Sequence, residues 1–244
     1  MAYPRQNAGV NAPASLTILA VTGLPEIGPG DDLAALISAA TALVEGDVVV
    51  VTQKIVSKAE GRVVAVDPDD ATARRELAES DAVRVLRRRG DMVITETRHG
   101  FVCANSGVDL SNMADGYAAL LPIDPDRSAR RIRDALRART GCEVGVIISD
   151  TFGRPWRRGV TDVAIGCAGL RAVVDLRGTT DALGRRLVAT EICLVDEIAG
   201  AAELVMGKAS GIPVAVVRGL DPSVFGSGSV REQVVRPYCE DLFR

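Results

Sequence analysis

An acid and two hydroxyl groups stand directly after a run of apolar residues near the middle of the chain. Val144–Ile148 predicts a buried strand, and Ser149, Asp150 and Thr151 follow at its end. Hard cations such as Mg²⁺ or Mn²⁺ take oxygen ligands of this kind, usually one or two carboxylates together with phosphate oxygens. The stretch therefore indicates either a site for a metal ion and an anionic substrate, or a strand followed by a solvated basic loop. The basic residues of that loop are Arg154, Arg157 and Arg158.

Other polar side chains also follow apolar runs. Lys54 and Lys58 come after a valine-rich predicted strand at 47–52, and Asp109 and Asn112 lie together in a polar loop. Each of them alone is an ordinary surface residue. Together they are what a metal–nucleotide site would need. The chain has neither a GxxxxGK[ST] loop nor a GxGxxG turn after its first strand, so the usual P-loop and Rossmann phosphate sites are not expected.

Composition and charge narrow the class of protein. With 244 residues, the chain can bury a substantial core in a single domain. Its net charge of −3 and aromatic content of 3% do not favour nucleic acid as a partner. No apolar run approaches the roughly 20 residues that span a bilayer, so no membrane association is expected. Residues 1–15 lack the apolar centre of a signal peptide, and we expect a flexible tail on a cytoplasmic protein whose domain covers 16–244.

Histidine and cysteine add few candidates for chemistry. His99 is the only histidine and lies in a predicted turn, which argues against a Ser-His-Asp triad or a multi-histidine metal site. The cysteines are odd in number, far apart and without a CxxC pair, so neither a disulfide framework nor a zinc site is expected. They are Cys103, Cys142, Cys167, Cys193 and Cys239.

Hydrophobic periodicity predicts strands and helices in mixed order rather than in regular alternation. The segment 187–195 is ambiguous between strand and helix. We therefore predict an α+β fold with mixed, largely antiparallel sheets and flanking helices. The expected strands are 16–21, 47–52, 62–66, 92–97, 101–105, 144–149, 160–168, 171–176 and 212–218. The expected helices are 33–45, 69–89, 125–140 and 196–206.

Several separate blocks of the chain resemble one family, the coenzyme F420:glutamate ligases, also called F420-0:gamma-glutamyl ligases. The resemblance is greatest to the actinobacterial form. There the ligase domain is followed by an FMN-binding, nitroreductase-like domain, which would begin where this chain stops. The blocks are GLPEIGPGDD at 23–32, TQKIVSKAEG at 52–61, GVDLSN at 107–112, SDTFGRPWR at 149–157 and DEIA at 196–199.

The resemblance implies an activity. Such enzymes add L-glutamate through an amide bond to the precursor F420-0, and then to the gamma-carboxylate of F420-1 and its longer products. GTP is the co-substrate, and an acyl phosphate is the expected intermediate. The implied cofactors are Mg²⁺ or Mn²⁺, two ions in all, together with K⁺. The implied assembly is an intertwined homodimer.

The resemblance also implies site residues, carried over position by position. Asp109 and Asp150 are the implied catalytic residues. The implied nucleotide-binding residues are Leu24, Pro25, Glu26, Ile27, Gln53, Lys58 and Asn112. The implied metal ligands are Asp109, Asp150 and Thr151.

The chain departs from the family pattern at two positions. Gln53 stands where relatives often have serine, and Lys208 stands where some archaeal members have a glutamine near metal and nucleotide. Glu191, Asp196 and Glu197 are further candidate cation ligands, although Asp196 is better explained as a helix-capping residue.

Two other functions remain open from the residues. One is a metal-dependent nucleotide phosphohydrolase or phosphotransferase on the same scaffold, which would release phosphate without glutamate. The other is a nucleotide-binding regulatory domain without catalysis. The presence of Asp109, Asp150 and Thr151 argues against the second.

Overall fold

A computed structural model describes residues 13, 15–67, 69–111 and 113–242. Most of the predicted tail and Asn112 lie outside the described residues.

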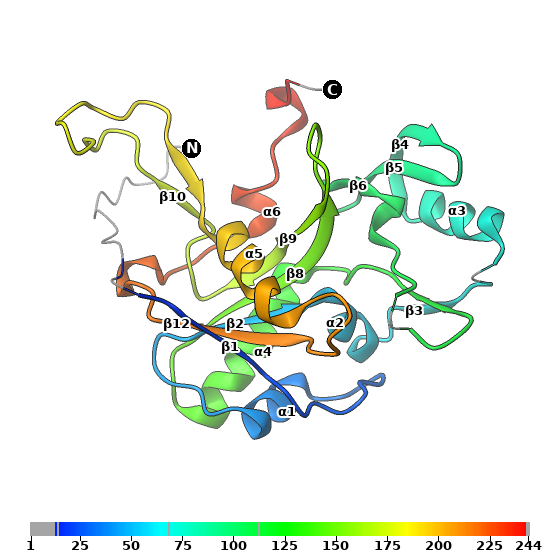
Figure 1. Ribbon diagram of the computed structural model, residues 1–244, viewed down its shortest axis with the longest axis horizontal. Helices are drawn as coiled ribbons and strands as arrows, with labels where there is room; N and C mark the ends of the chain where they lie inside the picture. Colours follow the sequence, from blue (N-terminus) through cyan, green and yellow to red (C-terminus); the bar gives the residue numbers. More distant parts are fainter. Residues whose placement is uncertain (1–12, 14, 68, 112, 243–244) are drawn as a thin grey trace.

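A five-stranded sheet forms the centre of the molecule, in the order β1-β12-β2-β8-β9 (Figure 1). Neighbouring strands are antiparallel except for β2 and β8, which run parallel. The residues of β2 and β12 are mostly valine and almost wholly buried, as expected for a strand covered on both faces. The strands are β1 (Thr17–Ala20), β12 (Val214–Arg218), β2 (Val48–Thr52), β8 (Gly145–Gly153) and β9 (Val160–Ala168).

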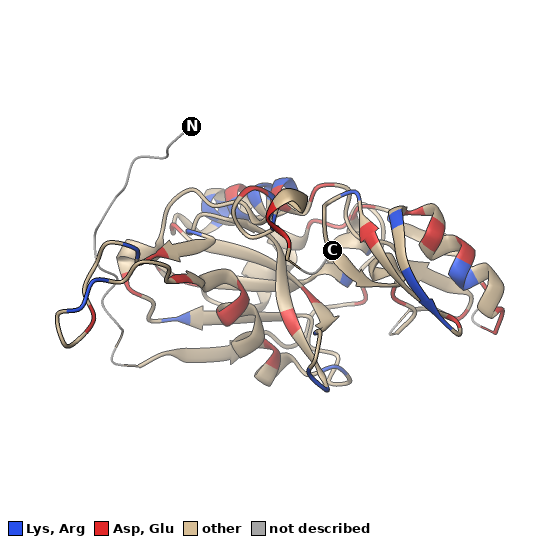
Figure 2. Cartoon of the chain, turned by 90° about the horizontal axis from the view of Figure 1, so that it is seen from above, with Lys and Arg blue, Asp and Glu red and all other residues tan. Residues whose placement is uncertain are grey.

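Helices cover both faces of this sheet (Figures 1 and 2). On one side lie α1 (Leu33–Ala40) and α4 (Pro125–Thr140), which pack against each other, and on the other lies α5 (Leu194–Met206). The predicted helix at 125–140 is confirmed as α4: Asp124 caps its first turn and Gly141 ends it with a left-handed φ of 74°. Of the described helices, none is both long and apolar enough to cross a membrane.

Smaller sheets flank the centre. They are β3 with β7 (Val63–Ala65 and Tyr117–Ala119), β4 with β5 and β6 (Ala82–Arg89, Met92–Thr97 and Val102–Ala104), and β10 with β11 (Val173–Asp175 and Glu191–Cys193). The remaining helices are α2 (Gln53–Ala59), α3 (Ala71–Ser80) and α6 (Val230–Gln233). Three single 3₁₀ turns are η1 (Asn105–Gly107), η2 (Pro222–Val224) and η3 (Tyr238–Glu240).

The predicted helix at 69–89 is wrong in its second half. The helix α3 ends at Ser80, and the chain then forms β4, which pairs with β5 across a turn at Gly90, whose φ is 58°. Val83 in this strand is 69% exposed. The segment has β-branched residues, and cross-strand pairing with β5 outweighs its helix propensity. Its arginines form a basic stretch on an exposed strand rather than the last turn of a helix (Figure 2).

Most of the other elements expected from the sequence are present in the structure. The α+β class with mostly antiparallel sheets is confirmed, and the ambiguous segment at 187–195 contains β11 and the start of α5. The first helix is shorter than predicted, since it ends at Ala40. All five cysteines are free thiols.

Gly166 provides a test of how tightly α4 packs on the central sheet. A Cβ atom at Gly166 would lie 2.3 Å from the backbone carbon of Pro125, so Gly166→Ala should push α4 off β9. We expect the free energy of unfolding to fall by about 3 kcal/mol, measured by urea denaturation. Gly153→Ala is the matched control, because nothing lies within 4 Å of the added atom. Equal stability of the two variants would contradict this packing.

Candidate functional site

The parallel pair β2 and β8 brings two polar segments to one edge of the sheet. Thr52, the last residue of β2, lies opposite Ser149 of β8. The chain leaves β2 directly into α2, beginning with Gln53, while β8 continues through Asp150 and Thr151. Carboxyl ends of neighbouring parallel strands are a common place for ligand sites, because the connecting segments diverge there.

A separate loop delivers Asp109 to the same edge. Its backbone forms a two-way bridge with Ala119. Just before it, Asn105 and Ser106 both have left-handed φ angles, of 51° and 55°. Ser106 is held there because its amide donates to Thr95 Oγ1 (2.9 Å) and its hydroxyl donates to the carbonyl of Ala78 (2.5 Å). Such backbone strain persists only where surrounding contacts fix it, so the position of this loop is well determined.

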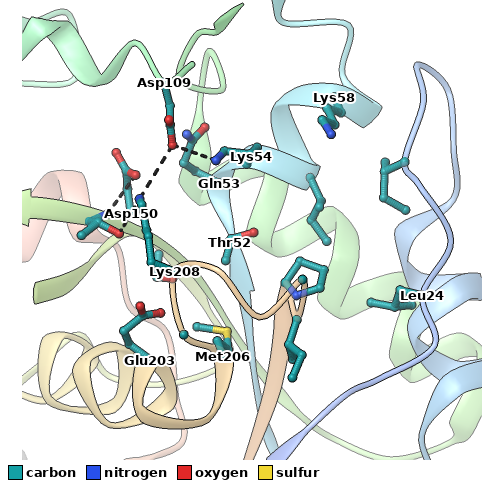
Figure 3. Close-up of a pocket in the computed structure, with 18 of the residues that line it drawn as sticks. Leu24, Thr52, Gln53, Lys54, Lys58, Asp109, Asp150, Glu203, Met206 and Lys208 are labelled. Atoms are coloured by element: carbon teal, nitrogen blue, oxygen red, sulfur yellow. Dashed lines mark hydrogen bonds and ion pairs between the residues drawn. The ribbon is translucent and has the colours of Figure 1, made fainter. Parts of the chain in front are cut away.

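These segments enclose a cavity of about 410 Å³ (Figure 3). All the described residues that the family resemblance implies line it, and Asn112 lies outside the described residues. They come from the 23–30 loop, α2, the 107–111 loop and β8. Further lining residues are Thr52, Lys54, Ile55, Ser149, Asp162, Glu203, Met206, Gly207, Lys208, Gly211, Ile212 and Pro213.

Asp109 is held between hydrogen bonds and ion pairs. Its Oδ1 accepts from the amide and the hydroxyl of Ser111, both at 2.7 Å. Its Oδ2 pairs with Lys54 Nζ at 3.0 Å and with Lys208 Nζ at 3.9 Å (Figure 3). Burial alone would raise the pKa of Asp109, but the Ser111 hydrogen bonds and the Lys54 charge lower it below its ordinary value. Asp109 is therefore charged near neutral pH.

Asp150 has fewer compensating partners. Its Oδ1 accepts one hydrogen bond, from the Thr151 amide at 2.9 Å. Burial raises the pKa of Asp150 to about 7, against the lowering effect of that hydrogen bond, and the neighbouring charges of Asp109 and Asp162 raise it further. A cation beside Asp150 would stabilise its ionised form, so this carboxylate fits a metal-binding role.

Asp162 on β9 was not predicted from the sequence. It is buried and accepts hydrogen bonds from Ser149 Oγ (2.9 Å) and Thr151 Oγ1 (2.7 Å). Asp162 therefore fixes the rotamers of both hydroxyls that follow the apolar run. In its strand Asp162 stands between Thr161 and Val163, a setting that by itself does not indicate a functional residue.

Asp196 has a structural position rather than a place in the cavity. The β8–β9 ladder shifts register between Ile148 and Ser149, which is typical of a β-bulge. At the bulge the amide of Ala164 donates to Asp196 Oδ1 at 2.9 Å. The predicted capping role of Asp196 is wrong, since Cys193 is the N-cap of α5 and Asp196 lies in its first turn; Asp196 instead satisfies a backbone group in the ladder that positions Asp150.

The other candidate ligands also lie outside the cavity lining. Glu191 pairs with Arg177 at 3.0 Å. Neither Glu191 nor Glu197 lines the cavity. The basic loop after β8 is exposed and does not line it either, which matches the solvated-loop interpretation of Arg154, Arg157 and Arg158.

Lysine is confined to this site. The chain has three lysines among 29 basic residues, and all three line the cavity: Lys54, Lys58 and Lys208. Lys58 is buried and forms an ion pair with Glu26 across the cavity. Lysine carries a compact point charge on a flexible stem, whereas arginine presents a broad planar fork. This uneven use of lysine is a further sequence signal for Lys54 and Lys208 as site residues.

The donor set suits a hard metal ion that shares its coordination with a substrate. Asp109, Asp150 and Thr151 offer only oxygen atoms. Within the described part of the chain, no three His, Cys, Asp or Glu side chains form a metal cluster. Magnesium in particular is often bound by one or two carboxylates plus substrate phosphates rather than by a complete protein cage. The residues present therefore fit Mg²⁺ or Mn²⁺ held jointly with a phosphorylated ligand.

Comparison with known proteins gives consistent matches over most of the chain. A family model described as F420-0:Gamma-glutamyl ligase matches residues 23–219. A coenzyme F420:L-glutamate ligase of Methanothermobacter thermautotrophicus is 40% identical over 251 residues, covering 94% of this chain and 99% of its own. One of Methanopyrus kandleri is 44% identical over 236 residues, covering 90% and 94%. A third, of Methanocaldococcus jannaschii, is 42% identical over 217 residues, covering 82% and 85%.

The raised pKa of Asp150 predicts a pH-dependent cost to stability. Folded Asp150 binds its proton more tightly than the unfolded chain, so its stabilising contribution is complete below pH 3.8 and is lost as pH rises through about 7. In chelator-treated protein, Asp150→Asn should therefore raise the melting temperature most at pH 8 and progressively less toward pH 4. The expected rise is about 2–4 °C for each kcal/mol that the charge costs.

Differential scanning calorimetry measures this effect, with Asp91→Asn as the control because Asp91 lies in an exposed turn. If Asp150→Asn melts at the same temperature as the parent protein at every pH, the charge of Asp150 does not destabilise the fold and the prediction is wrong.

Proposed function

The chain belongs to the F420-0:gamma-glutamyl ligase family, and on that premise we propose that it joins L-glutamate to the coenzyme F420 precursor in a GTP-dependent reaction. The observation that carries the proposal is the convergence of Asp109 and Asp150, from separate segments, on one cavity that also holds every lysine of the chain. Two carboxylates and three ammonium groups can bind both a metal ion and a triphosphate.

The cavity has an apolar side and a charged side, and we place the nucleotide accordingly. Leu24 lies on the side away from Asp150 and Glu203 (Figure 3). The base would rest against the 23–27 loop and the apolar residues Ile212 and Pro213. The triphosphate would extend toward the lysines. In this arrangement the ammonium of Lys58 would leave the carboxylate of Glu26 and bind a phosphate oxygen instead.

One metal ion would be held by Asp109 and Asp150, and Thr151 would help to hold any second ion. When bound, Mg²⁺ or Mn²⁺ screens the repulsion between the triphosphate and the incoming carboxylate. Lys54 keeps Asp109 ionised and oriented. The bulge at Ser149 and the hydrogen bonds to Asp162 hold the hydroxyl of Thr151 toward the cavity.

The proposed chemistry couples two displacements. An oxygen of the F420-0 carboxylate attacks the gamma-phosphorus of GTP, the bond between that phosphorus and the bridging oxygen breaks, and GDP leaves. The amine of glutamate then attacks the acyl carbon, phosphate leaves with the bonding electrons, and the nitrogen loses a proton to form the amide. F420-1 can enter the same cycle through the gamma-carboxylate of its glutamate. The protein mainly positions groups and neutralises charge, as is usual in phosphoryl transfer.

We also propose that the active assembly is a homodimer. The loop between β10 and β11 extends away from the rest of the molecule (Figure 1) and exposes Leu183 and Val188 at 79% and 81%. Leu204 of α5 is exposed at 83%. Side chains of this size are usually covered in the working protein when they gather on a projecting arm. Sedimentation equilibrium would test this, and a monomer at all concentrations would contradict it.

Mass spectrometry of the deazaflavin product tests the proposed reaction directly. Incubation of F420-0 with GTP, Mn²⁺ and L-glutamate should yield product heavier by one or more glutamyl residues, with GDP formed in step. Omitting glutamate should suppress GDP formation. GDP release at the same rate without glutamate would instead indicate the phosphohydrolase alternative.

Lys58→Met tests the placement of the triphosphate. The variant removes a charge-assisted contact, so we expect the Kd for GTP to rise about 10- to 100-fold while the Kd for F420-0 changes little. Glu26 is well exposed, so losing its partner should not unfold the protein. Calorimetric titration measures both constants. An equal loss for the two ligands would remove Lys58 from the phosphate site.

A further inference from the structure

Lys208 lies where the candidate metal ligands face the cavity. It follows Gly207, the residue that ends α5, and its side chain reaches between the strand β8 and the 107–111 loop (Figure 3). Its Nζ lies 3.2 Å from Thr151 Oγ1 and 3.9 Å from Asp109 Oδ2. One ammonium group thus bridges two of the three oxygen donors that fit a metal ion.

The hydrogen bonding of Thr151 shows which side of its hydroxyl the ammonium occupies. A hydroxyl has one proton to donate and lone pairs to accept with. The Thr151 proton goes to Asp162 Oδ1 at 2.7 Å, so Lys208 Nζ donates to a remaining lone pair. A metal ion bound to Thr151 would need that same oxygen, and the ammonium and the ion repel each other. Lys208 and a metal ion are therefore alternatives at this position.

The contacts of Asp109, the other oxygen donor beside Lys208, support the same conclusion. Its Oδ1 is satisfied by Ser111, and its Oδ2 is the oxygen that faces the two lysines. Lys54 is largely buried, with 13% of its side chain exposed, and belongs to the cavity wall. The side chain of Lys208 is 55% exposed, so it reaches the site from the solvent side.

From this geometry we infer that Lys208 is a tethered cation that takes the place of one metal ion beside Asp109 and Thr151, so that the loaded site binds a single divalent ion. The inference rests on the proposed function, because it concerns the metal site of that reaction. It assigns the chain a metal requirement that differs from the two ions expected from the family resemblance. An ammonium suits this role because it is a compact point charge, whereas a guanidinium is broad and planar.

The consequence is that removing the charge of Lys208 should open a second ion site. The probe is Mn²⁺ itself, in the presence of a non-hydrolysable GTP analogue, counted by equilibrium dialysis and by electron paramagnetic resonance. We expect the parent protein to bind about one Mn²⁺ per chain, with the spectrum of an isolated ion. Lys208→Met and Lys208→Gln should each bind about two, with a spin-coupled spectrum from neighbouring ions.

The two substitutions at Lys208 distinguish the loss of its charge from the gain of a new metal ligand. Methionine matches lysine in length and adds no oxygen donor, whereas glutamine adds an amide oxygen. A gain in both variants assigns the effect to the lost charge. Arg89→Met is the control for a general change in net charge, because Arg89 lies exposed at the end of β4. It should bind the same number of ions as the parent protein.

Three results would overturn the inference. Two ions in the parent protein would show that Lys208 displaces none, while leaving the proposed metal-dependent ligase intact. One ion in the parent and in both variants would show that Lys208 does not occupy an ion position. The proposed function would still stand in that case. Binding of Mn²⁺ to none of the proteins would overturn this inference and the proposed metal site together.

Discussion

The parallel pairing of β2 with β8 is the contact on which the site depends. It places Thr52 beside Ser149, so that α2 and the acidic end of β8 leave the sheet at the same edge. Both strands are buried under helices on either face, which fixes their register through packing on two sides. A slip by one residue would turn Asp150 to the opposite face of the sheet and remove it from the cavity.

The second feature that shapes the site is an excess of buried negative charge at that edge. Burial raises the pKa of Asp150, and the charges of Asp109 and Asp162 raise it further. Lysine side chains and hydroxyl and amide donors compensate part of this negative charge. The negative charge that remains uncompensated at Asp150 would attract a cation. A binding site can hold such an unfavourable charge because ligand binding removes the cost.

Lysine and arginine are divided between different tasks in this chain. Arginine forms the surface ion pairs, such as Arg88 with Glu79 and Arg177 with Asp175, where a forked donor meets a carboxylate in a bidentate fashion. Lysine is confined to the cavity, where the proposed reaction would use a small mobile charge to approach phosphate or to replace an ion. The same distinction explains why Lys208 can stand between Asp109 and Thr151.

The sequence by itself determined the elements with strong local signals: the valine-rich β2, the capped helix α4, the hairpin of β5 with β6, and the acid and hydroxyls that follow the apolar part of β8. It also allowed the family resemblance to be seen, because the motif blocks are local. Only the tertiary structure decided the rest. The strand β4 forms because it pairs with β5. The structural role of Asp196 depends on a bulge in the β8–β9 ladder, where it accepts a hydrogen bond from a backbone amide. The contacts of Asp162 and Lys208 join residues far apart in the chain, and no periodicity in one segment can report how two segments meet.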